Sequence, residues 1–266
     1  MIQKEQNGLV YFQFDAFSQK KNIKHFISTR INNKDTSFNL SLYNRSNTNE
    51  IIENRQDLAK FVDIPFTNFI FQQQVHSKNI SILTKADAGK GIQAYYDGIS
   101  DNDAMITNKP GVCLTVMAGD CVPILFYDPI KKIIAAAHAG WRGTYKRVTQ
   151  LTIEMMTNQF GCKASDILAG IGPSISQKNY EVDDNVYIEF EKRFDNLSQI
   201  FTNTDENGKY YLDLWEANKQ QLISAGLSKE NIELSNICTF DQNNLFFSAR
   251  RGDKGRFVAG IMLCDD

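Results

Sequence analysis

The chain has 266 residues, of which 42% are hydrophobic and 23% charged, and its formal net charge is -2. This length is sufficient for a large hydrophobic core, and we expect residues 1–266 to form a single domain. The near-neutral charge argues against a nucleic-acid or anionic-membrane partner. No apolar stretch approaches the roughly 20 residues that span a bilayer, and the first residues lack the apolar core of a secretory signal.

The cysteines and histidines are few and widely spaced. The chain contains five cysteines, which are Cys113, Cys121, Cys162, Cys238 and Cys264. An odd number of scattered cysteines in a chain of this length is typical of a reducing compartment, so we expect a cytoplasmic protein without a disulfide framework. The three histidines are His25, His76 and His138.

The first half of the chain contains short apolar runs that are rich in β-branched and aromatic residues. Such runs predict strands, whereas apolar residues at three- and four-residue steps predict helices. We expect a helix at 47–61 and a surface loop at 88–103. The expected strands are 10–17, 24–29, 69–74, 80–83, 112–117, 124–127 and 133–137.

The second half mixes helical and strand patterns without regular alternation. A helix is expected to open at Gly143 and Thr144 and to stop at Gly161, and further helices at 184–194 and 214–225, the last capped by Asp213. Strands are expected at 167–171, 232–234, 245–248 and 257–263. This mixture predicts an α+β fold, a single-domain mixed-sheet α/β sandwich, rather than a doubly wound parallel sheet.

A metal site is the first chemical hypothesis that the sequence supports. The apolar run I-I-A-A-A leads into His138, Cys121 follows Asp120 in M-A-G-D-C-V-P, and His76 ends the segment Q-Q-Q-V-H. Two imidazoles and a thiolate suit zinc, and three protein ligands leave a fourth position for water or substrate, as in catalytic zinc sites. The spacing is too long for a local zinc finger, so other interpretations of these residues remain open.

Three alternatives use the same residues differently. Cys121 as a thiolate with His138 as its base would make a metal-free hydrolase or transferase. The protein could instead hold a nucleotide-like ligand without catalysis. Without any function, His138 would be a hydrogen-bonded core residue and Cys121 a buried small hydrophobe.

Arginines near these motifs are candidates for binding an anion. Arg142, in W-R-G-T, lies where a helix is expected to begin, and Arg250 follows an expected strand. A guanidinium matches phosphate with two parallel hydrogen bonds. Arg251 and Lys254, in the segment R-R-G-D-K-G-R, are interpreted as part of a solvated basic turn.

Several motifs together resemble one family. They are Q-V-H-S at 74–77, D-C-V-P at 120–123, H-A-G-W-R-G at 138–143, G-P-S-I at 172–175, Y-E-V at 180–182, C-T-F at 238–240 and F-F-S-A-R-R with a following G-R. The chain is similar in these segments to the YfiH family, also described as laccase-domain or polyphenol oxidoreductase proteins and as purine nucleoside phosphorylases. The matches run in order from about residue 39 to the C-terminus.

The resemblance implies an α/β sandwich in which His76, Cys121 and His138 are both the metal ligands and the catalytic residues. It implies zinc-dependent phosphorolysis of adenosine, inosine and S-methyl-5'-thioadenosine, and deamination of adenosine. The partners would be purine nucleosides and phosphate, and no obligate protein partner is evident. The family usually has T-A-D-C where this chain has A-G-D-C, and often has cysteines where Q-K-N precedes Y-E-V, so the pocket shape can differ.

Roles for the remaining candidates are hypotheses. Arg142 and Arg250 would bind phosphate, Gln74 would hold a purine edge or orient His76, and Asp120 would fix a histidine tautomer. Ordinary loop hydrogen bonding is the alternative for Gln74 and Asp120. Two histidines and a cysteine also suit a single copper ion, which we interpret as adventitious, because three histidines are too few for a multicopper centre.

Overall fold

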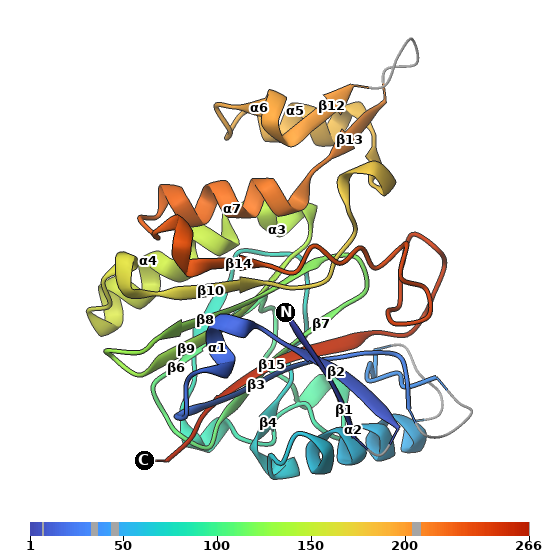
Figure 1. The fold of residues 1–266 in the computed structure, drawn as a ribbon, viewed down its shortest axis with the longest axis vertical. Coiled ribbons are helices and arrows are strands. Elements are labelled where there is room, and N and C mark those ends of the chain that lie inside the picture. Colours follow the sequence, from blue (N-terminus) through green and yellow to red (C-terminus); the bar gives the residue numbers. More distant parts are fainter. Residues whose placement is uncertain (7, 33–36, 44–47, 204–208, 266) are drawn as a thin grey trace.

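The structure is a computed structural model, and it describes residues 1–6, 8–32, 37–43, 48–203 and 209–265 (Figure 1). In these ranges no helix is long and apolar enough to cross a membrane. The helices are α1 (Asp15–Ser18), α2 (Asn49–Phe61), α3 (Trp141–Tyr145), α4 (Val148–Phe160), α5 (Asp184–Glu191), α6 (Leu197–Ile200) and α7 (Leu214–Ser224).

The first large sheet joins the two ends of the chain. Its spatial order is β1 (Ile2–Gln6), β2 (Leu9–Gln13), β3 (Ile23–Ser28), β15 (Phe257–Leu263), β7 (Cys113–Ala118) and β4 (Phe69–Ile70). Neighbouring strands are antiparallel, except that β4 runs parallel to β7. The C-terminal strand β15 therefore lies inside a sheet that the first half of the chain otherwise provides.

The second large sheet carries the hairpin that positions the site. Its order is β14 (Ile232–Leu234), β10 (Leu168–Ile171), β8 (Val122–Asp128), β9 (Ile133–Ala139), β6 (Ala104–Thr107) and β5 (Ile80–Ile82). Strands β8 and β9 are antiparallel and pair Pro123 with His138. The start of β8 consequently lies beside the end of β9.

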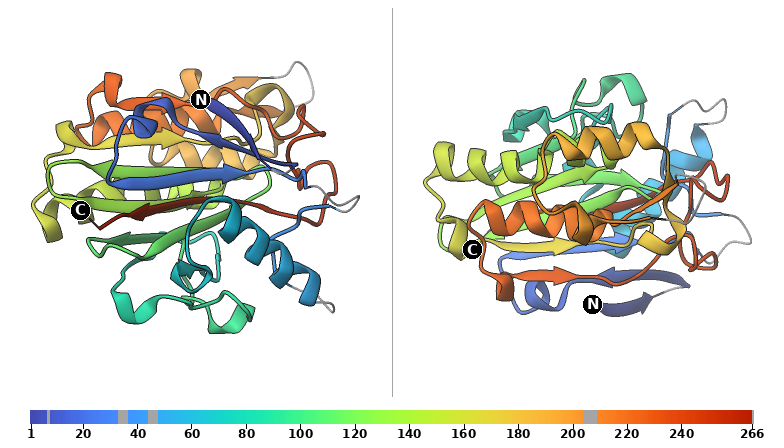
Figure 2. Two further views of the ribbon diagram at one scale, coloured as in Figure 1. Left: turned by 60° about the horizontal axis from the view of Figure 1, so that its bottom comes forward. Right: turned by 90° about the horizontal axis from the view of Figure 1, so that it is seen from above.

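The two sheets pack face to face between layers of helices. On β8, Leu125 faces the first sheet and clusters with Val116 of β7, whereas Ile124 faces the helices and clusters with Ile153 of α4. Because β8 and β9 are buried on both faces, they read as continuous apolar runs rather than as alternating patterns. On the far side, α2 covers the first sheet (Figures 1 and 2).

This arrangement confirms the expected mixed-sheet α/β sandwich. The shared packing of β8 and β9 agrees with one domain over residues 1–266, which stays a prediction. A small third sheet of β11 (Glu181–Val182), β13 (Tyr210–Leu212) and β12 (Phe201–Asn203) lies with α5 and α6 at one end of the molecule (Figure 1).

Several expected boundaries need correction. The strand expected at 10–17 ends at Gln13 and gives way to α1. The strand expected at 69–74 is short, because from Phe71 onward the chain bonds to loop carbonyls of Lys90 and Ile99. Residues 245–248 form a loop, in which Ser248 N–H donates to the Asp253 carboxylate at 2.9 Å. Residue 47, where the helix now seen as α2 was expected to begin, lies outside the described residues.

The helix expected after Gly143 is two helices. Arg147 has φ of 65°, a left-handed conformation that ends the short α3 and precedes α4. Gly161 also has φ of 65° and terminates α4, as expected from its lack of a Cβ atom. At α7, Asp213 accepts from Glu216 N–H at 2.9 Å, which confirms the predicted N-cap.

Candidate metal and catalytic site

The three predicted ligands meet at one edge of the second sheet. His138 lies near the end of β9, Cys121 directly precedes β8, and His76 lies in the loop between β4 and β5. One ligand atom from each of the three lies within 4.8 Å of the others. Sγ of Cys121 is 3.7 Å from Nε2 of His76, and the two imidazole centroids are 4.9 Å apart. Three residues that are far apart in the sequence are therefore neighbours in the fold. We refer to His76, Cys121 and His138 as the trio.

Gly140 gives the trio the space that it occupies. A Cβ atom at this position would lie 2.7 Å from Sγ of Cys121 and 2.9 Å from Cδ2 of His76. Both distances are shorter than any ordinary carbon contact, so a larger residue would displace the ligands. The glycine of H-A-G-W-R-G is therefore explained by close approach to the trio.

Asp103, which the sequence analysis did not single out, orients two of the ligands. Its carboxylate lies 2.8 Å from Nδ1 of His138 and accepts from the backbone N–H groups of Val75, His76 and Ser77 and from the Ser77 hydroxyl. Asp103 directly precedes β6, which neighbours β9. Its sequence signal, an acidic residue before a buried apolar run, becomes informative only once that strand pairing is known.

The electrostatics of the trio favour an ion pair. Burial opposes ionisation of Cys121, but the charge and hydrogen bonds of His138 and His76 outweigh it and lower the thiol pKa to about 6. Burial likewise opposes protonation of His138, but the Cys121 thiolate and the Asp103 carboxylate raise its pKa to about 9. In the protein without metal, the pair is therefore a thiolate beside an imidazolium.

This donor set fits a zinc ion. A thiolate and two imidazole nitrogens are common zinc ligands. With Nδ1 of His138 held by Asp103, the other ring nitrogen remains for a metal, which is the usual carboxylate–histidine–metal arrangement. Three protein ligands also leave a coordination position for another group.

The trio forms part of the wall of a cavity. The residues that line this trio cavity are Ser41, Tyr43, Gln74, His76, Tyr95, Met117, Ala118, Gly119, Cys121, His138, Ala249 and Arg256. Its wall combines aromatic rings, a few polar groups and one arginine beside the candidate metal ligands. This composition is typical of a small-molecule site.

Gln74 and Asp120 have structural partners. Gln74 lines the cavity, but its amide donates to the Met117 carbonyl at 2.8 Å and accepts from Met117 N–H at 2.7 Å. The Asp120 carboxylate accepts from the hydroxyls of Thr239 and Ser248 and from Arg250 N–H, at 2.7, 3.0 and 2.7 Å. The expectation that Asp120 orients a histidine is therefore corrected: Asp103 has that position, and Asp120 ties the turn before Cys121 to the C-terminal loop.

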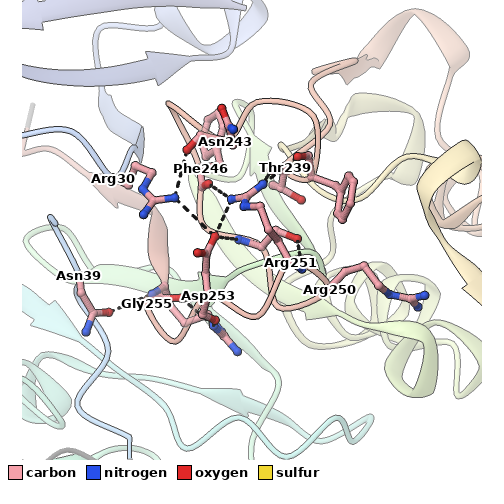
Figure 3. Close-up of polar contacts among 12 residues, drawn as sticks. Arg30, Asn39, Thr239, Asn243, Phe246, Arg250, Arg251, Asp253 and Gly255 are labelled. Carbon is pink, nitrogen blue, oxygen red and sulfur yellow. Dashed lines mark hydrogen bonds and ion pairs between the residues drawn. The ribbon is translucent and has the colours of Figure 1, made fainter.

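Arg142 and Arg250 do not line the trio cavity. The exposed Arg142 lies over the ring of its neighbour Trp141, with its guanidinium carbon 4.3 Å from the ring centroid. Arg250 lies 5.3 Å from the Tyr180 ring centroid and donates to the Glu181 carbonyl at 2.8 Å. Figure 3 shows its side chain extending away from the neighbouring network. The suggested role of Arg142 and Arg250 in binding phosphate stays a prediction.

Arg251 is a structural clamp rather than part of a solvated turn. Its guanidinium pairs with Asp253 at 2.5 Å and donates to the carbonyls of Thr239, Phe240 and Phe246 (Figure 3). These contacts cross-link the C-terminal loop from within, and that loop carries Ala249 and Arg256 to the cavity.

The fold and the trio together define a mixed-sheet sandwich with a His–Cys–His site. The profile of the family described as multi-copper polyphenol oxidoreductase laccase matches residues 24–264, and the chain belongs to this family. The resemblance to YfiH proteins is also confirmed. The crystal structure of Bacillus licheniformis hypothetical protein YfiH superimposes with a TM-score of 0.90 at 29% identity, covering 97% of each chain.

Relatives of the chain carry names that refer to nucleosides, as two examples illustrate. A protein named purine nucleoside phosphorylase, from Bacteroides thetaiotaomicron, is 36% identical over 256 residues, covering 94% of this chain and 95% of that protein. A protein named adenosine deaminase RL5, from an unknown prokaryotic organism, is 32% identical over 231 residues, covering 86% and 88%.

Proposed function

We propose that the chain is a cytoplasmic, zinc-dependent purine nucleoside phosphorylase that acts on adenosine, inosine and S-methyl-5'-thioadenosine and also deaminates adenosine. The observation that carries this proposal is the convergence of the trio in a cavity, with Asp103 orienting His138. The names of the two relatives support the choice of purine nucleosides as substrates.

The residues do not fit the multicopper chemistry in the family's description. A multicopper oxidase needs many imidazoles, whereas this chain has three histidines. His25 is already engaged on β3, where its Nε2 accepts from Phe14 N–H at 2.8 Å. Only a single ion can be held by the trio, and a copper ion there would be adventitious.

Phosphorolysis requires the chain to hold a nucleoside and phosphate together. The C1'–N9 bond breaks, a bond from phosphate oxygen to C1' forms, and the base leaves with the electron pair and takes up the proton that phosphate loses. A zinc ion held by the trio would act as a Lewis acid towards an oxygen ligand. Asp103 keeps the ring of His138 in place, and Lys146 helps to fix the His76 loop by donating from Nζ to the His76 carbonyl at 3.0 Å. The aromatic walls of the cavity, Tyr43 and Tyr95, suit a purine ring.

A nucleoside panel tests the proposal. Protein of measured zinc content is incubated with adenosine, inosine or S-methyl-5'-thioadenosine, with and without phosphate, and free base, ribose phosphate and ammonia are quantified. We expect phosphate-dependent release of base from each nucleoside and ammonia from adenosine. Ammonia alone would leave only a deaminase. The Cys121→Ala variant should lose turnover by orders of magnitude, whereas Lys254→Ala, on the exposed loop, should change it little.

The two alternatives give different results in the same assays. A metal-free Cys121–His138 enzyme would keep its activity after complete removal of zinc and lose it on thiol alkylation. A non-catalytic ligand-binding protein would show no turnover with any nucleoside, and its cellular function would survive Cys121→Ala. The metal-dependent enzyme loses activity on chelation and regains it when zinc is restored.

A further inference from the structure

Among the described residues that line the trio cavity, Arg256 is the only arginine or lysine. We propose that Arg256 is the phosphate-binding residue of this cavity, and that the oxyanion lies against the wall formed by Arg256 and Gly119. This inference rests on the proposed phosphorolysis and names the residue that selects its anionic substrate. Arg142 and Arg250, the candidates from the sequence, would then have no direct role with phosphate.

The position of Arg256 is fixed from both the backbone and the side chain. Its N–H donates to Oδ1 of Asn39 at 2.9 Å, and its carbonyl accepts from Leu40 N–H at 3.1 Å. Its Nη1 donates to the carbonyls of Asp253 and Gly255 at 3.0 and 2.6 Å. Figure 3 shows Asn39, Gly255 and Asp253 grouped in this region. A guanidinium held in this way loses little conformational freedom when it binds a ligand.

The guanidinium also keeps donors for a ligand. Arginine has five N–H donors, and the two carbonyl contacts of Arg256 use only Nη1. Within the described ranges, no carboxylate is within ion-pair distance of Arg256, in contrast to Arg251, which is paired with Asp253. The donors on Nε and Nη2 form the planar fork that matches two oxygens of a phosphate.

Gly119 provides the space in which the Arg256 side chain lies. A Cβ atom at residue 119 would be 2.9 Å from Cδ and 3.2 Å from Nε of Arg256. The guanidinium therefore lies against the backbone at Gly119, two residues before the Cys121 ligand. An alanine at this position would displace the arginine without removing its charge, and the displaced atoms belong to a flexible side chain.

The other described residues that line the cavity offer few groups that could bind an anion. Tyr43 and Tyr95 form an aromatic wall, with ring centroids 5.1 Å apart. The side-chain amide of Gln74 is engaged at both ends, because its nitrogen donates to the Met117 carbonyl and its oxygen accepts from Met117 N–H. Aromatic rings suit the purine, whereas a phosphate requires charged donors. Among the described residues of this cavity, and apart from the trio itself, Arg256 supplies the charge that can hold phosphate.

Steady-state kinetics of Arg256→Met tests the inference. Phosphorolysis of inosine is measured over a range of phosphate concentrations, and deamination of adenosine is measured in phosphate-free buffer. We expect the KM for phosphate to rise about 100-fold, the loss expected for two charge-assisted hydrogen bonds. Arg256→Lys should recover part of this loss, and deamination should stay within about threefold of the wild type.

Two further variants separate binding from general damage. Gly119→Ala should raise the KM for phosphate while keeping the net charge and the thermal midpoint, and Lys254→Met should leave the KM for phosphate unchanged. An unchanged KM in Arg256→Met, an equal loss of both reactions, or a raised KM in Arg142→Met or Arg250→Met instead would overturn the inference. Absence of phosphate-dependent base release by the wild-type protein would overturn the proposed function as well, so the two failures are distinguishable.

Discussion

Asp103 offers the sharpest test of how the site is assembled. Burial opposes its ionisation, but the hydrogen bond and charge of His138 and the contacts from Ser77 outweigh this and keep the carboxyl pKa below its usual value. Asp103→Asn keeps the shape and removes the charge. It also places an NH₂ group where one carboxylate oxygen accepts, so that donors from the His76 loop or from His138 face another donor.

The expected loss has two components. Replacing the carboxylate that orients a metal-binding histidine weakens metal affinity by about 10- to 100-fold. A buried donor left without an acceptor costs about 1–3 kcal/mol, and in a protein of this size each kcal/mol shifts the melting midpoint by roughly 2–4 °C. Competition with a chromophoric chelator measures zinc affinity, and calorimetry of the metal-free protein measures the midpoint.

Asp101→Asn is the matched control for this substitution. Asp101 is exposed, lies two residues away in the same loop, and has φ of 46°, a conformation that asparagine tolerates. We expect the control to retain zinc affinity and stability. Zinc affinity of Asp103→Asn within twofold of the wild type would refute the view that this carboxylate orients the trio.

The remaining predictions concern the trio and its surroundings. Because its pKa is lowered to about 6, Cys121 in the metal-free protein is mainly thiolate at pH 7, and its alkylation by iodoacetamide should rise with a midpoint near pH 6. A midpoint above about pH 8 would contradict this, and bound zinc should protect the thiol. Gly140→Ala should abolish tight zinc binding, because its Cβ would meet Cys121 and His76, while circular dichroism shows the fold retained.

The fold class could be predicted because the central buried strands are recognisable in the sequence as apolar runs. The runs at 112–117, 124–127 and 133–137 are apolar throughout, and the structure places them in β7, β8 and β9. The limits of elements at the site were less predictable. Phe71 and the residues after it resemble a strand in composition, yet their backbone groups bond to loops that come close only in the folded chain.

The convergence of the three candidate ligands could be predicted from residue type and resemblance, but the residues that support them could not. His76, Cys121 and His138 are rare and chemically distinctive, whereas Asp103 is an ordinary acidic residue until β6 is paired with β9. Arg256 was one of several basic residues in a short segment. Only tertiary contacts distinguish it from Arg251, whose guanidinium already donates to backbone carbonyls and pairs with Asp253.

The position of His76 links metal binding to the packing of the two sheets. The loop that carries it leaves β4 in the first sheet and enters β5 in the second. Cys121 likewise lies in the turn from β7 of the first sheet to β8 of the second, whereas His138 lies within β9 of the second sheet. Asp103 holds the loop through three consecutive N–H groups, and an ion bound by the trio would hold it again through the ring. Because the trio forms only when the sheets are packed, we expect a bound metal ion to stabilise the folded sandwich, by about 2.7 kcal/mol when free metal is 100 times the Kd.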